Sequence, residues 1–350
     1  MKELFIVAII AMVFVVIFQI AKASEYVSVL KGEDLARKQS NKINGFLLIV
    51  FLIVGLIGVW VCNEWFFKKT LFPQGSASVE GEKIDSMLYL TIAVTGIIFF
   101  ITQILLFWFS FKYQEAQGKK AHFFAHSTKL ELIWTTIPAI ALTVLVAFGL
   151  MHWFKITGDP PSNAITVEIT GHQFGWEVRY PGKDGILGKK DYKLYNSPTG
   201  NTLGVDFNDV NSNDDLHTTE MHLIKGTPVK LVINAQDVIH NVGLSHFRLK
   251  MDAVPGIPTT MWFTPKYTTA EMKVRTGNPN FVYEISCDQM CGSGHFSMRG
   301  VIVVEDEADY KKWIASQKPE YFTLFPAKDP TKTSVDTTVK LAVNTISVKK

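Results

Sequence analysis

The sequence predicts a membrane-anchored protein in which three or four transmembrane helices precede an external all-β domain. Two long stretches, residues 87–111 and 132–154, contain no Asp, Glu, Lys or Arg. About 20 consecutive apolar residues are enough to cross the hydrocarbon core of a bilayer. After residue 164 the chain changes to short β-rich runs broken by Gly, Pro and Asn. This pattern is typical of a β-sandwich or barrel.

The N-terminal residues 4–21 form another apolar stretch, interrupted only by Gln19. A signal peptide and a membrane helix are both compatible with it, because Ala21-Lys-Ala23 resembles a cleavage site. The stretch is long for the apolar region of a signal peptide, and the only basic residue before it is Lys2. We therefore expect a retained helix.

A further uncharged stretch, residues 46–62, predicts an additional membrane helix. Lys and Arg concentrate in segments 22–43 and 112–130, which places both in the cytoplasm by the positive-inside rule. Segment 63–86 mixes Lys with acidic residues and is expected outside. Everything after residue 154 then lies outside as well.

Five segments are therefore expected along the chain. They are an N-terminal helix (membrane span or signal) with a cytoplasmic loop (1–43), an extra membrane helix with an external loop (44–86), a transmembrane hairpin (87–158), the external β domain (159–305), and a C-terminal helix with a surface-draped or mobile tail (306–350).

The β domain carries a polar insertion, residues 181–215, that is rich in Gly, Asn and Asp. Its acids could hold calcium, but no EF-hand spacing is present, so a solvated surface insertion is the favoured interpretation. The acids of the insertion are Asp206, Asp209, Asp214 and Asp215.

In the C-terminal segment we expect a short helix over 309–317 with Trp313 on its buried face.

Composition excludes some classes of protein. The net charge is only +3, which gives no reason to expect a nucleic-acid partner. There are three cysteines, at positions 62, 287 and 291, which are too few for a disulfide framework.

The strongest chemical signal is the loop that contains Cys287, Cys291, His295 and Met298. Thiolates and thioethers are soft ligands, and imidazole suits copper as well as zinc. A mononuclear blue-copper site needs one Cys, so the second Cys suggests two copper ions bridged by two sulfurs. A zinc loop and a disulfide remain as alternatives at this point.

A two-copper centre needs another imidazole. Chemistry alone does not choose among the external histidines, because a lone His near a strand end is more often a surface residue than a ligand. These histidines are His172, His217, His222, His240 and His246.

Several patches, which together span most of residues 85–315, resemble subunit II of cytochrome c oxidase, a haem-copper respiratory oxidase. Residues 131–138 (ELIWTTIP) resemble the start of the family's second conserved helix, and 171–176 (GHQFGW) its aromatic segment. Residues 237–240 (DVIH) and 250–256 (KMDAVPG) resemble the segment with its first copper ligand. Residues 287–298 resemble its binuclear CuA loop.

The resemblance implies a cupredoxin-like sandwich and a binuclear copper (CuA) centre. Cys287 and Cys291 would bridge the two coppers, and His240 and His295 would each bind one. Met298 would be a weak ligand to one copper, and the backbone carbonyl of Gln289 a weak ligand to the other.

The resemblance also implies a function. The chain would accept electrons from a cytochrome c on the external face of a bacterial inner membrane. It would pass them to haem in subunit I, where O₂ is reduced to water and protons are pumped. Phe174 and Trp176 would lie in the segment that receives electrons, and Glu131 would stand at the cytoplasmic mouth of a proton path. A membrane-anchored copper-delivery protein is the alternative function.

Some positions depart from the family pattern. Phe174 stands where many members have a tryptophan, which together with the insertion favours a membrane-bound or complex-associated donor. Gln289 replaces a glutamate that reaches a magnesium ion, and because an amide is a poorer Mg²⁺ ligand, that site is left open. The chain has no CxxCH, so the donor haem must belong to another chain.

Overall fold

A computed structural model describes residues 2–116 and 118–330. The chain divides into two compact units, which are described separately. One runs to Thr70 and resumes over Tyr89–Ala141; the other combines Leu71–Leu88 with the chain from Leu142 onward.

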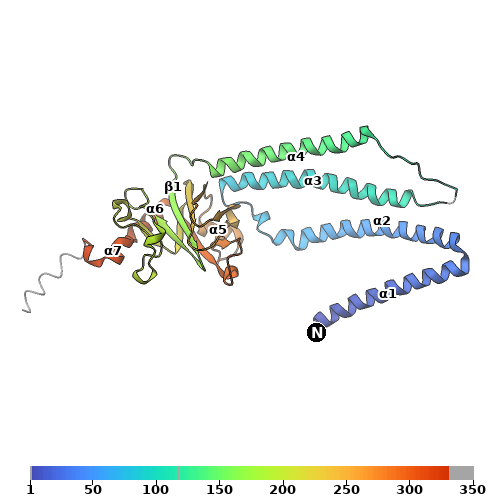
Figure 1. Cartoon of the computed structure of the whole chain (residues 1–350), viewed down its shortest axis with the longest axis horizontal. Coiled ribbons are helices and arrows are strands. Elements are labelled where there is room, and N and C mark those ends of the chain that lie inside the picture. Colours follow the sequence, from blue (N-terminus) through green and yellow to red (C-terminus); the bar gives the residue numbers. More distant parts are fainter. Residues whose placement is uncertain (1, 117, 331–350) are drawn as a thin grey trace, which may run out of the picture. The chain divides into compact units, whose positions relative to one another are not determined.

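Four long helices occupy the N-terminal part of the chain (Figure 1). All four are long and apolar enough to cross a membrane, as the uncharged stretches predict. Each helix extends past its apolar stretch into polar flanking residues. They are α1 (Lys2–Lys31), α2 (Glu33–Trp65), α3 (Val79–Lys112) and α4 (Thr128–Thr157).

Segment 22–43 was expected to be a loop, and this expectation is wrong in detail. The segment is helical except at Gly32, which separates α1 from α2 with a φ of 84°. Such a left-handed backbone suits glycine because it has no Cβ. The flanking residues are mainly Ala, Glu, Lys, Arg and Leu, which favour helix even outside a membrane.

The external part is a sandwich of two five-stranded sheets, as the short alternating runs predict. One sheet has the order β3-β2-β1-β5-β8 and the other the order β4-β10-β9-β6-β7. The strands are β1 (Ile165–His172), β2 (Gly175–Tyr180), β3 (Leu216–Thr218), β4 (Glu220–Ile224), β5 (Val229–Ala235), β6 (His240–Leu244), β7 (Leu249–Ala253), β8 (Thr259–Phe263), β9 (Tyr283–Cys287) and β10 (Arg299–Glu305).

The core lies between the sheets and follows from the two-residue period of the strands. In β5, Val229, Leu231 and Ile233 are fully buried, while the residues between them are only half-buried. Ile285 on β9 and Ile302 on β10 contribute from the other sheet. Because β9 and β10 both contribute to this core, the core fixes both ends of the loop that joins them.

The segment expected as an external loop, 63–86, partly packs on the β domain. The N–H of Ala77 donates to the carbonyl of His246 at 2.8 Å, and Asp85 pairs with Arg248 at 2.8 Å. Ala77 is buried in the core of the sandwich. The first turns of α3 therefore belong to the same unit as the strands.

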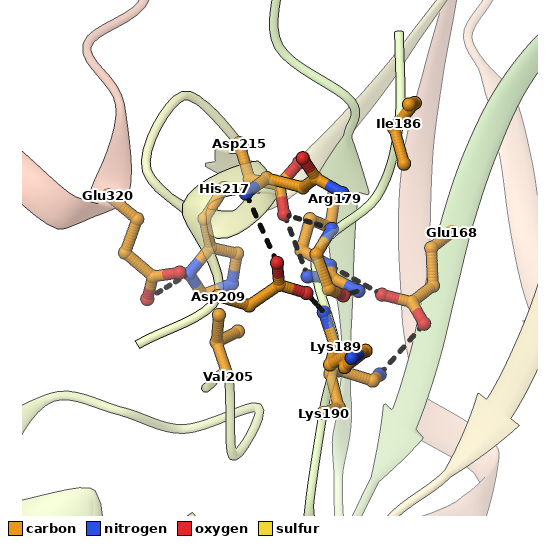
Figure 2. Close-up of polar contacts among 12 residues, drawn as sticks. Glu168, Arg179, Ile186, Lys189, Lys190, Val205, Asp209, Asp215, His217 and Glu320 are labelled. Carbon is orange, nitrogen blue, oxygen red and sulfur yellow. Dashed lines mark hydrogen bonds and ion pairs between the residues drawn. The ribbon is translucent and has the colours of Figure 1, made fainter. Parts of the chain in front are cut away.

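The insertion 181–215 connects β2 to β3. Part of it is buried, which corrects the expectation of a wholly solvated segment. Arg179, at the end of β2, pairs with Asp215 at 2.8 Å and with Glu168 of β1 at 2.6 Å (Figure 2). Because Asp215 is buried against this arginine, it is a structural partner rather than a surface acid.

Three shorter helices complete the domain, and one confirms the predicted C-terminal helix. Trp313 on this helix is half-buried and stacks on His222, with ring centroids 3.9 Å apart. The expected tail falls largely on 331–350, which lie outside the described residues. The helices are α5 (Thr269–Thr276), α6 (Glu307–Ser316) and α7 (Glu320–Leu324).

Candidate metal centre

The ligand loop is held by a strand at each end. β9 ends at Cys287, a short 3₁₀ turn spans His295–Ser297, and β10 begins at Arg299. β6 pairs with β9 so that Val242 faces Cys287, which places His240 two residues away along the neighbouring strand. Sheet register therefore brings together residues that are far apart in the sequence.

The candidate donor atoms form one cluster. The two cysteine sulfurs are 3.7 Å apart. Nδ1 of His240 is 3.8 Å from the sulfur of Cys287, and Nδ1 of His295 is 3.6 Å from the sulfur of Cys291. The sulfur of Met298 lies 3.8 Å from the sulfur of Cys291, and the carbonyl oxygen of Gln289 lies 3.2 Å from the sulfur of Cys287.

The cluster is largely shielded from water. His240, Cys287, Cys291 and Met298 are buried, while His295 is half-buried. Burial, followed by the neighbouring Cys287, raises the pKa of the Cys291 thiol to about 11. Both cysteines are free thiols rather than a disulfide. A metal ion that binds here must displace thiol protons, so its affinity will depend on pH.

The donor set indicates the kind of metal. Two sulfurs, two imidazoles and a thioether form a soft set that suits copper, whereas calcium and magnesium require oxygen ligands. Within the described ranges, His240, Cys287 and Cys291 are the one group of three or more His, Cys, Asp or Glu residues close enough to share an ion.

Neighbouring residues hold His240 in place. Oδ1 of Asp237 lies 2.8 Å from Nε2 of His240, which leaves Nδ1 facing the sulfurs. Burial by itself would raise the pKa of Asp237, but hydrogen bonds from His240 and from two backbone N–H groups hold it below its usual range. In the sequence, Asp237 is named only as the first residue of the DVIH motif, and its spacing of three residues from His240 was the available signal for this contact.

The two predicted aromatic residues lie beside the cluster. The ring of Trp176 meets His240 edge-on, with centroids 6.0 Å apart, and is buried. Phe174 is 40% exposed. Its ring lies so close to Gly294 that a Cβ at that glycine would be 2.5 Å from it. The structure thus brings Phe174 and Trp176 to the cluster of candidate donor atoms, with Phe174 at the surface and Trp176 buried.

The remaining histidines have other partners. His172 pairs with Glu177, and His217 lies between Glu177 and Glu320. His222 pairs with Glu305, and His246 packs against Phe281. Among the external histidines outside the loop, His240 is therefore the one whose ring nitrogen faces the cysteine sulfurs.

Comparison with known proteins decides the family. Residues 66–151 match the family model for the transmembrane domain of cytochrome c oxidase subunit II, and residues 165–306 match the model for its periplasmic domain. The chain belongs to the cytochrome c oxidase subunit II family. This confirms the family predicted from the sequence motifs. It also confirms the cupredoxin-like fold class and the place of the chain in a multi-subunit oxidoreductase.

Relatives of this subunit II share a large part of its length. An alternative cytochrome c oxidase subunit 2 from Bradyrhizobium diazoefficiens is 29% identical over 274 residues, covering 78% of this chain and 91% of that protein. A cytochrome c oxidase subunit 2 from Cereibacter sphaeroides is 25% identical, covering 65% and 73%. The solved periplasmic domain of subunit II from Bradyrhizobium japonicum aligns with 46% of this chain and 98% of that chain, at 23% identity and a TM-score of 0.32.

Glu131 of this subunit II lies in the first turn of α4. Its Oε1 accepts a hydrogen bond from the N–H of Ser127 at 3.4 Å. The hydroxyl of Ser127 accepts in turn from the N–H of Leu130. The local contacts of Glu131 are thus those of an acid at a helix N-terminus, where a negative charge is favourable.

Proposed function

We propose that this subunit II holds a binuclear copper centre of the CuA type. The ligands are the side chains of His240, Cys287, Cys291, His295 and Met298, with the backbone carbonyl of Gln289. The observation that carries the proposal is the convergence of these six donors, each 3.2–3.8 Å from a cysteine sulfur.

Held by Cys287, Cys291, His240 and His295, a copper pair would supply one-electron transfer in which the change of charge is shared between the two ions. The protein residues supply rigidity. Strands β9 and β10 fix both ends of the loop, and β6 fixes His240 through its pairing with β9. Ligands held by packed strands keep the same geometry in both redox states.

We infer that electrons arrive through the surface formed by Phe174 and leave toward haem in subunit I of a haem-copper oxidase. The donor is a cytochrome c on the external side of a bacterial inner membrane. Phe174 is exposed and packs on the ligand loop at Gly294, and the buried ring of Trp176 meets His240 edge-on. Phe174 would contact the donor cytochrome directly. A membrane-bound or complex-associated donor would be held close to this surface, whereas a soluble donor would not.

Glu131 has a separate proposed role. At the cytoplasmic end of α4 it is exposed and carries a carboxylate that can exchange protons with water. We assign it to the mouth of a proton path that continues into the catalytic subunit. Replacement by Gln would then slow proton uptake by the intact oxidase without changing its copper content.

The copper proposal is tested by Cys287→Ser in the intact oxidase. We expect loss of the paired copper and of cytochrome c oxidation, because a serine hydroxyl is a harder and far less acidic donor than the thiol that it replaces. Elemental analysis and electron spin resonance measure the copper pair. Cys62→Ser is the matched control, since Cys62 lies on α2 and its loss should change neither. Retention of two coppers and activity in Cys287→Ser would contradict the proposal, as would zinc without a copper signal in the unaltered protein.

A further inference from the structure

Gln173, in the turn between β1 and β2, makes two hydrogen bonds to the surroundings of the ligands. Its backbone N–H donates to Oδ2 of Asp237 at 2.7 Å, and its side-chain Nε2 donates to the backbone carbonyl of Cys291 at 2.6 Å. The other oxygen of Asp237 lies 2.8 Å from Nε2 of His240. A single residue from a third segment thus connects the ligand loop to the strand that carries His240.

The loop is shaped to receive this side chain. Gly292 follows Cys291, and a Cβ there would lie 2.9 Å from Nε2 of Gln173 and 3.0 Å from the ring of Phe174. Its φ of +133° is also unfavourable for residues with a Cβ. A side chain at 292 would therefore push the amide of Gln173 away from the carbonyl of Cys291.

We propose that Gln173 is a positioning residue for the copper centre and fixes the direction of the Cys291 peptide. The inference rests on the proposed copper centre. The sulfur of Cys291 and the imidazole of His240 then keep their spacing, because Gln173 bonds to one ligand residue directly and to the other through Asp237. Partners of this kind set ligand orientation and tune a metal site.

The bond also acts on the redox equilibrium. An N–H that donates to a carbonyl partly offsets the negative charge on the carbonyl oxygen. Without the donor, the uncompensated oxygen beside the centre favours the oxidised, more positive state. The equilibrium constant for reduction should then fall on the order of tenfold, the lower end of the changes in metal affinity or activity that follow the loss of an outer-shell partner.

Gln173 is exposed, so water competes for its amide. The backbone bond to Asp237 counters this, because it fixes the main chain and leaves only the side-chain rotamers to be ordered. Both Gln173→Leu and Gln173→Glu keep that backbone bond and remove the N–H donor to Cys291.

The test uses the full-length, detergent-solubilised protein loaded with copper. We expect Gln173→Leu and Gln173→Glu to keep two coppers per chain, with an altered electron spin resonance spectrum and a lower reduction potential. Gln317→Leu is the matched control. Gln317 also donates its side-chain amide to a backbone carbonyl, that of Trp313, at 3.3 Å. This bond lies at the C-terminal end of α6, not on the ligand loop.

The outcomes separate the two proposals. An unchanged spectrum and potential in Gln173→Leu with two coppers bound would overturn the positioning role alone, and so would equal changes in Gln317→Leu. If Gln173→Leu does not fold, Gln173→Glu, which matches glutamine in size, decides by the electron spin resonance spectrum alone, because the charge that it adds would lower the potential by itself. A missing copper pair in the unaltered chain would overturn the proposed function, and this inference with it.

Discussion

Residues outside the proposed ligand set hold the proposed ligands in position. Asp237 orients His240, and the ring of Trp176 meets the same imidazole edge-on. Gly171 leaves room for both rings, since a Cβ there would lie 2.8 Å from Trp176 and 3.1 Å from His240. The side-chain arrangement around His240 is thus set by hydrogen bonding and packing in the protein itself, as pre-organised metal sites require.

Replacing Asp237 by Ala should weaken copper binding about 10- to 100-fold, the usual cost of losing a hydrogen-bond partner of a ligating histidine. His240 would lose the contact that turns its Nδ1 toward the sulfurs. Competition with a chromophoric copper chelator measures the affinity. Asp309→Ala, on the exposed side of α6, is the control and should bind copper like the unaltered protein. Equal affinities for the two variants would refute this role for Asp237.

His217 predicts a pH dependence of stability. Burial by itself would lower its pKa, but contacts with Glu177 and Glu320 raise it to about 9. Because this is above the ordinary value of 6.5, the stabilisation is fully present below pH 6.5 and is lost as the pH rises through about 9. Thermal unfolding should show a loss on the order of 1–3 kcal/mol over this range. His217→Gln should remove this dependence; if the loss persists in that variant, another group causes it.

At the scale of elements, the insertion 181–215 is joined to the sandwich by buried charges rather than by strand pairing (Figure 2). Arg179 bonds Glu168 of β1, Asp215 before β3, and the carbonyl of Gly188 within the insertion. Lys190 adds a second contact to Glu168 at 3.0 Å. Burial raises the pKa of Asp215 to about 6 even beside Arg179, which shows how costly its charge is to bury.

Arg179→Met should therefore destabilise the β domain by about 3–5 kcal/mol, the usual cost of breaking a buried ion pair by removing one partner. Glu168 and Asp215 would remain buried without their main cation. Thermal unfolding measures the loss, and limited proteolysis should cut first within 181–215. Arg299→Met removes an exposed pair with Glu284 and should cost no more than about 1 kcal/mol. Similar losses in both variants would show that burial of the Arg179 cluster contributes little.

The predictability of these elements from sequence differs for physical reasons. The membrane helices, the sandwich and the ligand loop have local signals: uncharged stretches, two-residue alternation and soft ligands at short spacing. The roles of Gln173 and Arg179 depend on partners 118 and 36 residues away, which only the folded sheets bring near. The choice of His240 among five external histidines came from a family resemblance, because the register of β6 on β9 is not visible in the sequence.

At the scale of the whole molecule, Leu71–Leu88, which connects α2 to α3 and includes the first turns of α3, is part of the β unit. Ser78 donates its hydroxyl to the carbonyl of Phe247 at 2.7 Å, and Thr264 donates its N–H to Glu80 at 2.8 Å. Arg248 holds Asp85 in the first turns of α3. The start of α3 is thus fixed to the domain that carries the ligand loop, so this connection and the candidate metal centre belong to one compact unit.

The distribution of Lys and Arg makes a prediction about the sidedness of the whole chain. Segment 112–130 lies between two membrane-spanning helices and is basic, which places it in the cytoplasm and places the sandwich outside. Lys119 and Lys183 are both exposed, one in this segment and one in the insertion of the β domain. In spheroplasts, an impermeant maleimide should label Lys183→Cys directly but Lys119→Cys only after the membrane is permeabilised. The unsubstituted chain measures the background from the native cysteines. Labelling of Lys119→Cys in intact spheroplasts would reverse the orientation and leave the metal centre on the wrong side for an external cytochrome.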